Sequence, residues 1–228
     1  MCGIGGVISK DEVLRNDYID WINSKQKYRG PDNTDVFFDG NIGLCHQRLS
    51  IIDLSARSNQ PYNFSNIVLS FNGEVYNYND LLSKKKYSHL SSIYSDTSFF
   101  AKSWNDLGES ILQDLEGMYA ASIYTKNSNT ITLVADQFGI KSLYYYRNED
   151  LLLWASEFEA LFSFIKNRGL NYDISHKSLE SIYSFLAPLC GETLVKQINR
   201  VLPGEILTFN KNAHLIKKKY DIFFNKIN

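Results

Sequence analysis

The sequence predicts an α+β protein in which antiparallel sheets are covered by helices. Short apolar stretches bounded by Asn, Asp and Gly recur along the chain, for example around the turns at 127–129 and 148–150. The helical segments do not alternate regularly with strands, so a doubly wound parallel sheet is not expected. Aromatic residues make up 14% of the chain, mostly Tyr and Phe, and both favour strands.

The individual elements follow from hydrophobic spacing and from the residues that begin and end each segment. Ser95, Asp96 and Thr97 precede a segment of helical spacing that Gly108 closes. Helices are expected over 11–26, 77–86, 95–108, 156–167 and 175–186. Strands are expected over 5–9, twice within 36–53, over 67–77, three or four times within 118–156, and last over 205–209.

Length and composition limit the classes of protein that this chain could be. With 228 residues and 44% hydrophobic content, it can form one large domain, or two small ones, with a substantial core. The net charge of −1 includes no basic excess that would predict nucleic-acid binding. No apolar run approaches the roughly 18–20 residues that cross a bilayer, and the N-terminus has no secretory signal pattern. We therefore expect neither nucleic-acid nor membrane partners.

The cysteines point to a reducing compartment. Cys2, Cys45 and Cys190 are odd in number and widely spaced, so they predict neither a disulfide framework nor a metal site. Cys45 and Cys190 are expected in the core. His46 follows Cys45 in a strand, and adjacent strand residues face opposite sides, so a dyad of these two is not expected. The cytoplasm is the expected location.

The opening stretch MCGIGG places a cysteine at position 2 among glycines. If Met1 is removed, Cys2 carries a thiol and a free α-amine, whose ordinary pKa values are about 8.5 and about 7.7–8.0. The amine could then take the proton of the thiol, so that nucleophile and base would be one residue. The alternative is a glycine-rich first strand with an incidental cysteine.

Three further positions allow both a structural and a functional interpretation. Asn72-Gly73 is most simply a turn, although a side-chain amide and a backbone N–H could form an oxyanion hole. Arg48, in an otherwise apolar strand, needs a partner, which could be a structural carboxylate or the carboxylate of a substrate. Asp96 is most simply a capping residue at a helix start, but it could hold a substrate ammonium.

Taken together and in order, these motifs resemble the glutaminase half of glutamine-hydrolysing asparagine synthetases. That family belongs to the class II amidotransferases, which use an N-terminal nucleophile (Ntn). The resemblance runs from Cys2 to about Thr208. The motifs that carry it are MCGIGG, YRGPD, HQRLSIIDLS, NQPY, FNGEVYNY, SDT, LEGMYAASIY, ADQFGIKSLYYY, ASEFEAL and LPGE.

The resemblance implies a four-layer αββα sandwich with two antiparallel β-sheets, and it implies roles for particular residues. Cys2 would attack the side-chain amide of L-glutamine, and Asn72 with the Gly73 N–H would stabilise the oxyanion. Arg48 would pair with the α-carboxylate of glutamine. Glu74 and Asp96 would hold its α-ammonium. The backbone of Leu49, Ser50, Ile51 and Ile52 would line the pocket.

The resemblance also implies a partner. The glutamine amidotransferase type 2 domain would span residues 1–210, and residues 211–228 would be a polar tail or linker toward a synthetase domain. The Ser-Gly-Gly-x-Asp-Ser phosphate loop of that ATP-dependent domain does not occur in the sequence. The synthetase half would therefore be a continuation of the chain or a separate subunit, and ATP and Mg²⁺ would bind there. No cofactor and no metal is expected in the glutaminase domain.

Three hypotheses for function remain open at this point. The first is a glutaminase that supplies ammonia for ATP-dependent amide formation, which by family default makes asparagine but could serve another acceptor such as a sugar. The second is a non-catalytic glutamine-binding or docking module. The third is an Ntn hydrolase for a different amide, which the charged set of Arg48, Glu74 and Asp96 argues against. The sequence does not determine the oligomeric state.

Overall fold

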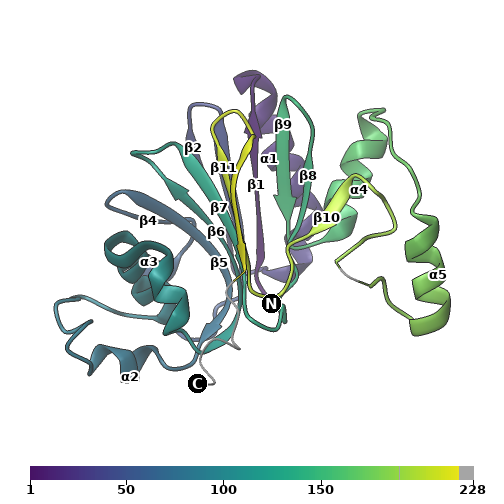
Figure 1. Cartoon of the computed structure of the whole chain (residues 1–228). Helices are drawn as coiled ribbons and strands as arrows, with labels where there is room; N and C mark the ends of the chain where they lie inside the picture. The colour runs from purple at the N-terminus through teal and green to yellow at the C-terminus, as the bar shows by residue number, and fades with distance from the viewer. Residues whose placement is uncertain (190, 221–228) are drawn as a thin grey trace.

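Two six-stranded antiparallel sheets form the centre of the molecule in a computed structural model that describes residues 1–189 and 191–220 (Figure 1). The first sheet, sheet A, has the strand order β10-β8-β9-β1-β3-β2, and the second, sheet B, has the order β12-β11-β7-β6-β5-β4. The strands of sheet A are β1 (Gly3–Ser9), β2 (Asn33–Asp39), β3 (Ile42–Arg48), β8 (Tyr144–Arg147), β9 (Leu151–Ala155) and β10 (Ile198–Arg200). Those of sheet B are β4 (Tyr62–Phe64), β5 (Ile67–Val75), β6 (Gly117–Thr125), β7 (Thr130–Ala135), β11 (Glu205–Asn210) and β12 (Leu215–Tyr220).

Helices cover the outer face of each sheet, which gives four layers (Figure 1). On sheet A lie α1 (Glu12–Gln26) and α4 (Phe158–Asn167), and α5 (His176–Phe185) stands beside them. On sheet B lie α2 (Tyr78–Leu82) and α3 (Asp96–Leu107). The expected αββα sandwich is therefore confirmed, as are the five expected helices. None of the described helices is long and apolar enough to cross a membrane.

Strand alternation sorts the core into three apolar layers. Ile4 and Leu44 of sheet A meet Val68 and Leu133 of sheet B between the two sheets. The residues that alternate with these face the helices, as Phe71 does beneath α3. Burying one such side chain typically stabilises a fold by about 1.5–3 kcal/mol. These three layers therefore hold the two sheets and their helices together.

Cys45 and His46 follow the same alternation and point in opposite directions. Cys45 packs in the layer between sheet A and the helices. His46 points the other way, and its Nε2 lies 3.1 Å from the carbonyl oxygen of Phe71 in sheet B. Because a carbonyl only accepts, Nε2 carries the proton, and burial lowers the ring's pKa to about 4. The prediction that these two residues form no dyad is confirmed.

Several expectations for individual elements differ from the structure. The strand expected over 205–209 is present as β11, but it is not the last strand, because β12 (Leu215–Tyr220) follows it and pairs with it in sheet B. Sheet B thus extends past residue 210, while the domain boundary placed there stays a prediction. The second strand expected within 36–53 ends at Arg48, and the residues after it form a loop. Cys190 and residues 221–228, which include part of the expected tail, lie outside the described residues.

Candidate active site

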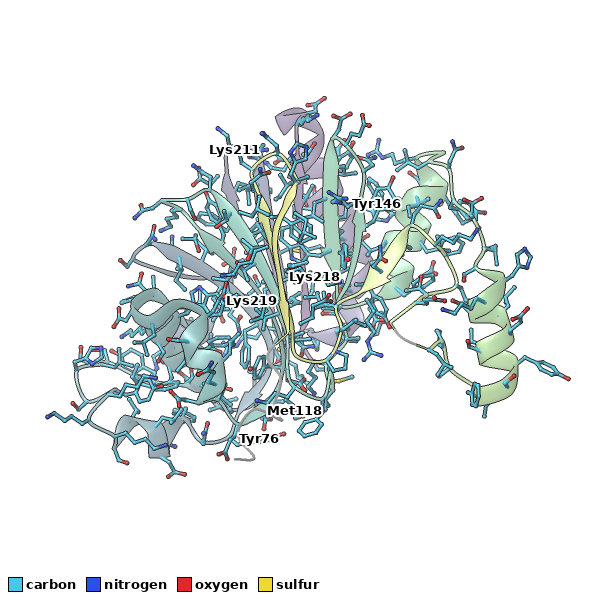
Figure 2. All side chains as sticks on the ribbon, viewed as in Figure 1. Tyr76, Met118, Tyr146, Lys211, Lys218 and Lys219 are labelled. Carbon is cyan, nitrogen blue, oxygen red and sulfur yellow. The ribbon has the colours of Figure 1, made fainter. Side chains whose placement is uncertain are left out.

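One cavity collects nearly all the predicted site residues. It lies where β1 begins and β3 ends, beside the last residues of β5 and the first residue of α3. Figure 2 places Met118, another lining residue, at the end of the sandwich where Figure 1 marks the N-terminus. The predicted residues that line the cavity are Cys2, Arg48, Leu49, Ile51, Ile52, Asn72, Gly73, Glu74 and Asp96.

The Cys2 thiol lies directly against the loop that follows β3. The backbone N–H of Leu49 points to its sulfur at 3.4 Å, and the carbonyl oxygen of Leu49 lies 3.6 Å from it. Burial raises the pKa of the Cys2 thiol, and this effect outweighs the Leu49 N–H and the nearby positive charges, which lower it. A thiol with a raised pKa is protonated at neutral pH, so this cysteine needs a base before it can act as a nucleophile.

Arg29 is hydrogen-bonded to the backbone of Cys2. Its Nε donates to the Cys2 carbonyl oxygen at 2.9 Å, and its Nη1 pairs with the Glu157 carboxylate. The Arg29 side chain is only 8% exposed and that of Glu157 25%, so this ion pair is partly shielded from solvent. In the structure Arg29 of the YRGPD motif thus fixes the main chain of Cys2.

Asn72 and Gly73 are not in a turn, contrary to the simplest interpretation of their sequence. They lie within β5 and pair with Ala120 and Tyr119 of β6. Gly73 has φ of +156°, and a Cβ there would lie 2.1 Å from the Met118 carbonyl oxygen, so only glycine fits. Nδ2 of Asn72 is buried and has no hydrogen-bond partner among residues 1–189 and 191–220. Its donor capacity is therefore unused in the resting protein.

Arg48 is the last residue of β3 and turns its guanidinium toward uncharged oxygens. Nη1 donates to the Ser55 carbonyl at 2.9 Å and to Oδ1 of Asn59 at 2.6 Å, and Nη2 donates to the Asp53 carbonyl. Within the described part of the chain no ion pair of Arg48 is found. Loop 53–59 thus orients a buried cation without neutralising it, which leaves its charge available to an anion in the cavity.

Asp96 is the first residue of α3, and its carboxylate faces the cavity. The expectation that Asp96 caps this helix is wrong, because Ser95 does so: its hydroxyl accepts from the Ser98 N–H. The Asp96 carboxylate instead accepts from the N–H groups of Thr97 at 2.7 Å and Val75 at 3.1 Å. Burial first, and then the neighbouring Glu74 carboxylate, raise the pKa of Asp96 to about 6. Two carboxylates thus adjoin on the wall of the cavity.

Of the predicted pocket loop Leu49–Ile52, one residue does not line the cavity. The N–H of Ser50 donates to the Asp32 carboxylate at 2.7 Å, on the side of the YRGPD motif. Leu49, Ile51 and Ile52 do line the cavity. Asp32 also donates its own N–H to the Arg48 carbonyl, so this motif holds both ends of the turn out of β3.

Other lining residues were not predicted from the sequence. They are Met1, Asp53, Ser58, Gln60, Phe71, Ser95, Thr97, Met118 and Lys141. Gln60 is buried and accepts the Phe71 N–H at 2.6 Å, so it joins β5 to the segment before β4. The segments NQPY and SDT belong to the motifs of the resemblance, but no local signal distinguishes a polar wall of a pocket from a polar surface loop.

Within the described residues, no group of three or more His, Cys, Asp or Glu side chains could hold a metal ion. The site instead brings a thiol and an amide donor together with two basic residues, Arg48 and Lys141, and three acidic ones, Asp53, Glu74 and Asp96, in a single cavity. Such a set can bind a zwitterion beside a nucleophile. A fold of this kind with this site defines the class of amidotransferases with an N-terminal nucleophile.

The comparisons with known proteins agree with that class. The glutamine amidotransferase domain family matches residues 1–221, and the chain belongs to this family. It is 33% identical over 169 residues to glutamine-hydrolysing asparagine synthetase 2 of Bacillus subtilis, covering 72% of this chain and 22% of that protein. It is 31% identical over 229 residues to asparagine synthetase 1 of the same organism, covering 96% of this chain and 35% of that protein. The chain thus spans well under half the length of these relatives.

The fold is also found in a solved structure of low sequence identity. Glutamine phosphoribosylpyrophosphate amidotransferase from B. subtilis superimposes with a TM-score of 0.66 at 20% identity. The match covers 97% of this chain and 50% of that one. It therefore extends the agreement from local motifs to the whole sandwich.

Proposed function

We propose that this chain hydrolyses L-glutamine to L-glutamate and ammonia, with Cys2 as the nucleophile after Met1 is removed. The observation that carries the proposal is the single cavity in which the Cys2 thiol, the unused Asn72 amide and the charged groups Arg48, Glu74 and Asp96 come together. Named relatives that hydrolyse glutamine to make asparagine support the choice of substrate.

The charged groups fit the head of an amino acid. Arg48 would receive the α-carboxylate, and Asp96 with Glu74 would receive the α-ammonium. An amide without this zwitterionic head would leave these buried charges unpaired, and such a mismatch can cost a site on the order of 10⁴-fold in discrimination. The extended side chain of glutamine would then place its amide carbon near Sγ of Cys2.

The reaction follows from the groups around the amide carbon. The free α-amine of Cys2 would take the thiol proton, and Sγ would attack the amide carbon to form an S–C bond and an oxyanion. Asn72 Nδ2 and the Gly73 N–H would stabilise that oxyanion. When it collapses, the C–N bond breaks, and the proton passes from the amine to the departing ammonia. Water would then attack the thioester, release glutamate and return the proton to sulfur.

Removal of Met1 is the first requirement, because it frees the amine. Met1 itself lines the cavity, so its loss would also open space for substrate. We expect the intact mass of the purified chain to lack one methionine, and the chain to release ammonia from L-glutamine. A chain that keeps Met1 and still hydrolyses glutamine would contradict this mechanism. Loss of Met1 with neither glutamine binding nor ammonia release would contradict the proposed substrate.

The ammonia would serve an ATP-dependent domain or subunit that forms an amide, asparagine by the family default. Matches to only part of the longer relatives support a linked synthetase half, and ATP and Mg²⁺ would belong to that half. The proposed location is the cytoplasm, where a free thiol stays reduced.

Glutamine binding should weaken at acidic pH because of Asp96. The pKa of this carboxyl is raised to about 6, so below that pH it becomes protonated and can no longer pair with an ammonium. In Cys2→Ala protein, which cannot turn over, we expect Kd for glutamine to rise up to about tenfold per pH unit below pH 6. Calorimetric titration from pH 5 to 8 measures this.

Asp96→Asn provides the control for this pH dependence. It should bind glutamine weakly at every pH, with a flat profile over the same range. A profile that still bends near pH 6 in Asp96→Asn would assign the titration to another group.

A further inference from the structure

A chain of hydrogen bonds joins the two oppositely charged ends of the cavity. It begins at Asp53, whose carboxylate oxygen Oδ2 lies 2.8 Å from Oγ of Ser58. Ser58 Oγ lies 3.0 Å from Oγ of Ser95, the capping residue of α3. Asp53 is also the residue whose carbonyl accepts from Arg48, and Ser95 directly precedes Asp96. This chain of hydrogen bonds therefore runs from Asp53, which holds the Arg48 guanidinium, to Ser95, which precedes the Asp96 carboxylate.

The proton positions along this chain follow from its two ends. A carboxylate only accepts, so Ser58 donates its single proton to Asp53 and must accept one from the Ser95 hydroxyl. Ser95 in turn accepts the Ser98 N–H at 3.3 Å. All three bonds thus point toward Asp53, and bonds aligned in one direction strengthen one another.

Asp53 is well suited to be the end of such a chain. Oδ1 accepts the Ser55 N–H at 3.0 Å, and Oδ2 also receives Nε of Arg57 at 2.8 Å. These hydrogen bonds, with that of Ser58, hold the pKa of the Asp53 carboxyl well below its usual range. Its side chain is only 8% exposed. The carboxylate therefore stays charged and fixed across the whole working pH range.

Ser58 links two segments that are distant in sequence, and a hydrogen bond from Gln60 Nε2 to Thr97 Oγ1 at 3.4 Å lies beside this link. Ser58 lies in the short helical turn η2 (Ala56–Ser58) and is 4% exposed, whereas Ser95 belongs to the start of α3. Both Ser58 and Asp53 line the cavity, and the Ser58 hydroxyl and the Asp53 carboxylate are bonded to each other. Their contacts join the loop that holds the Arg48 guanidinium to the segment that carries the Asp96 carboxylate.

From this arrangement we infer that Asp53 and Ser58 are positioning residues that fix the spacing at which the cavity accepts an α-carboxylate and an α-ammonium. The inference rests on the proposed function, since it assigns the two ends of the chain to the two charges of the glutamine head. Its consequence is that affinity for the zwitterion depends on the Ser58 hydroxyl through the spacing that it fixes, while the reacting groups at Cys2 and Asn72 are unaffected.

The test compares Ser58→Ala with the parent protein and with a matched serine variant. We expect Ser58→Ala to raise KM for glutamine about fivefold to tenfold, the value of one hydrogen bond of about 1 kcal/mol or slightly more. The kcat should stay within about twofold. Ser58→Thr, which keeps the hydroxyl, should restore most of the affinity. The control is Ser110→Ala, which removes a hydroxyl bonded to the Leu107 carbonyl beyond the other end of α3 and should leave KM unchanged.

A second measurement separates this inference from the proposed function. Calorimetry with Cys2→Ala and Cys2→Ala/Ser58→Ala measures glutamine affinity without turnover, and the same loss in affinity is expected there. If Cys2→Ala binds glutamine and adding Ser58→Ala changes Kd by less than twofold, the positioning role is wrong while the proposed function stands. If Cys2→Ala does not bind glutamine, both are overturned. Circular dichroism melting shows whether Ser58→Ala is folded. If it is unfolded, the same measurements are made with Asp53→Asn.

Discussion

Replacing Cys2 with alanine is expected to remove glutamine hydrolysis by a factor on the order of 10⁴ or more, the scale seen when a nucleophile is deleted. The thiol lines the cavity beside the Leu49 N–H, and it is the only thiol among the described residues that does so. Ammonia release from L-glutamine measures the loss. Cys2→Ala should still bind glutamine, because Arg48, Glu74 and Asp96 are unchanged.

Cys45→Ala is the matched control for this experiment. Cys45 is also a free cysteine, but it is buried on the helix-facing side of sheet A, where burial raises the pKa of its thiol far above the ordinary range. Its replacement should lower stability slightly and leave kcat within about twofold. If Cys2→Ala kept the parent rate, Cys2 could not be the nucleophile.

Cys2→Ser gives an intermediate test of the same chemistry. A serine hydroxyl keeps the shape of the side chain but loses its proton far less readily than a thiol. The burial that already raises the thiol's pKa would penalise an alkoxide even more. We therefore expect Cys2→Ser to bind glutamine as the parent does and to hydrolyse it little faster than Cys2→Ala.

Local sequence signals predicted most of the elements but missed the short or highly charged strands. β4 and β10 contain three residues each, too few to show a period. β12 carries Lys217, Lys218 and Lys219, so its sequence resembles a basic tail more than a strand. Lysines are typical of edge strands, where they prevent the pairing of a further strand. Here Lys217 and Lys219 form ion pairs with Glu109. Figure 2 labels Lys218 and Lys219 on this strand. Only the partner strand β11 reveals this segment as part of a sheet.

The candidate site was predicted through ordered motifs rather than through any single residue. Asn72-Gly73 has the sequence of a turn, and only its pairing with β6 shows that it is a strand end facing a cavity. Arg29 and Ser58 act through contacts with residues 27 and 37 positions away, which no local pattern encodes. Groups that contact a substrate are thus easier to infer from sequence than the groups that hold them.

Asn72→Ala is expected to lower kcat about 10²–10³-fold with little change in KM, the usual cost of removing one donor to an oxyanion. The reason is that Asn72 Nδ2 has no partner within the described residues, so its hydrogen bond would form only when the amide oxygen of glutamine becomes negatively charged. A group that acts only in the transition state affects kcat rather than substrate binding. Steady-state ammonia release over a range of glutamine concentrations separates these two parameters.

The unpaired amide nitrogen of Asn72 also leads to an expectation about the stability of the Asn72→Ala variant. Removing a buried side chain that holds hydrogen bonds is costly, but Asn72 Nδ2 gives up none in the resting protein. Asn72→Ala should therefore melt within a few degrees of the parent while losing most of its activity. Asn199→Ala, at an exposed position of β10, is the control and should keep both properties. A large loss of stability in Asn72→Ala, with activity per folded molecule unchanged, would show that this amide supports the strand and not the oxyanion.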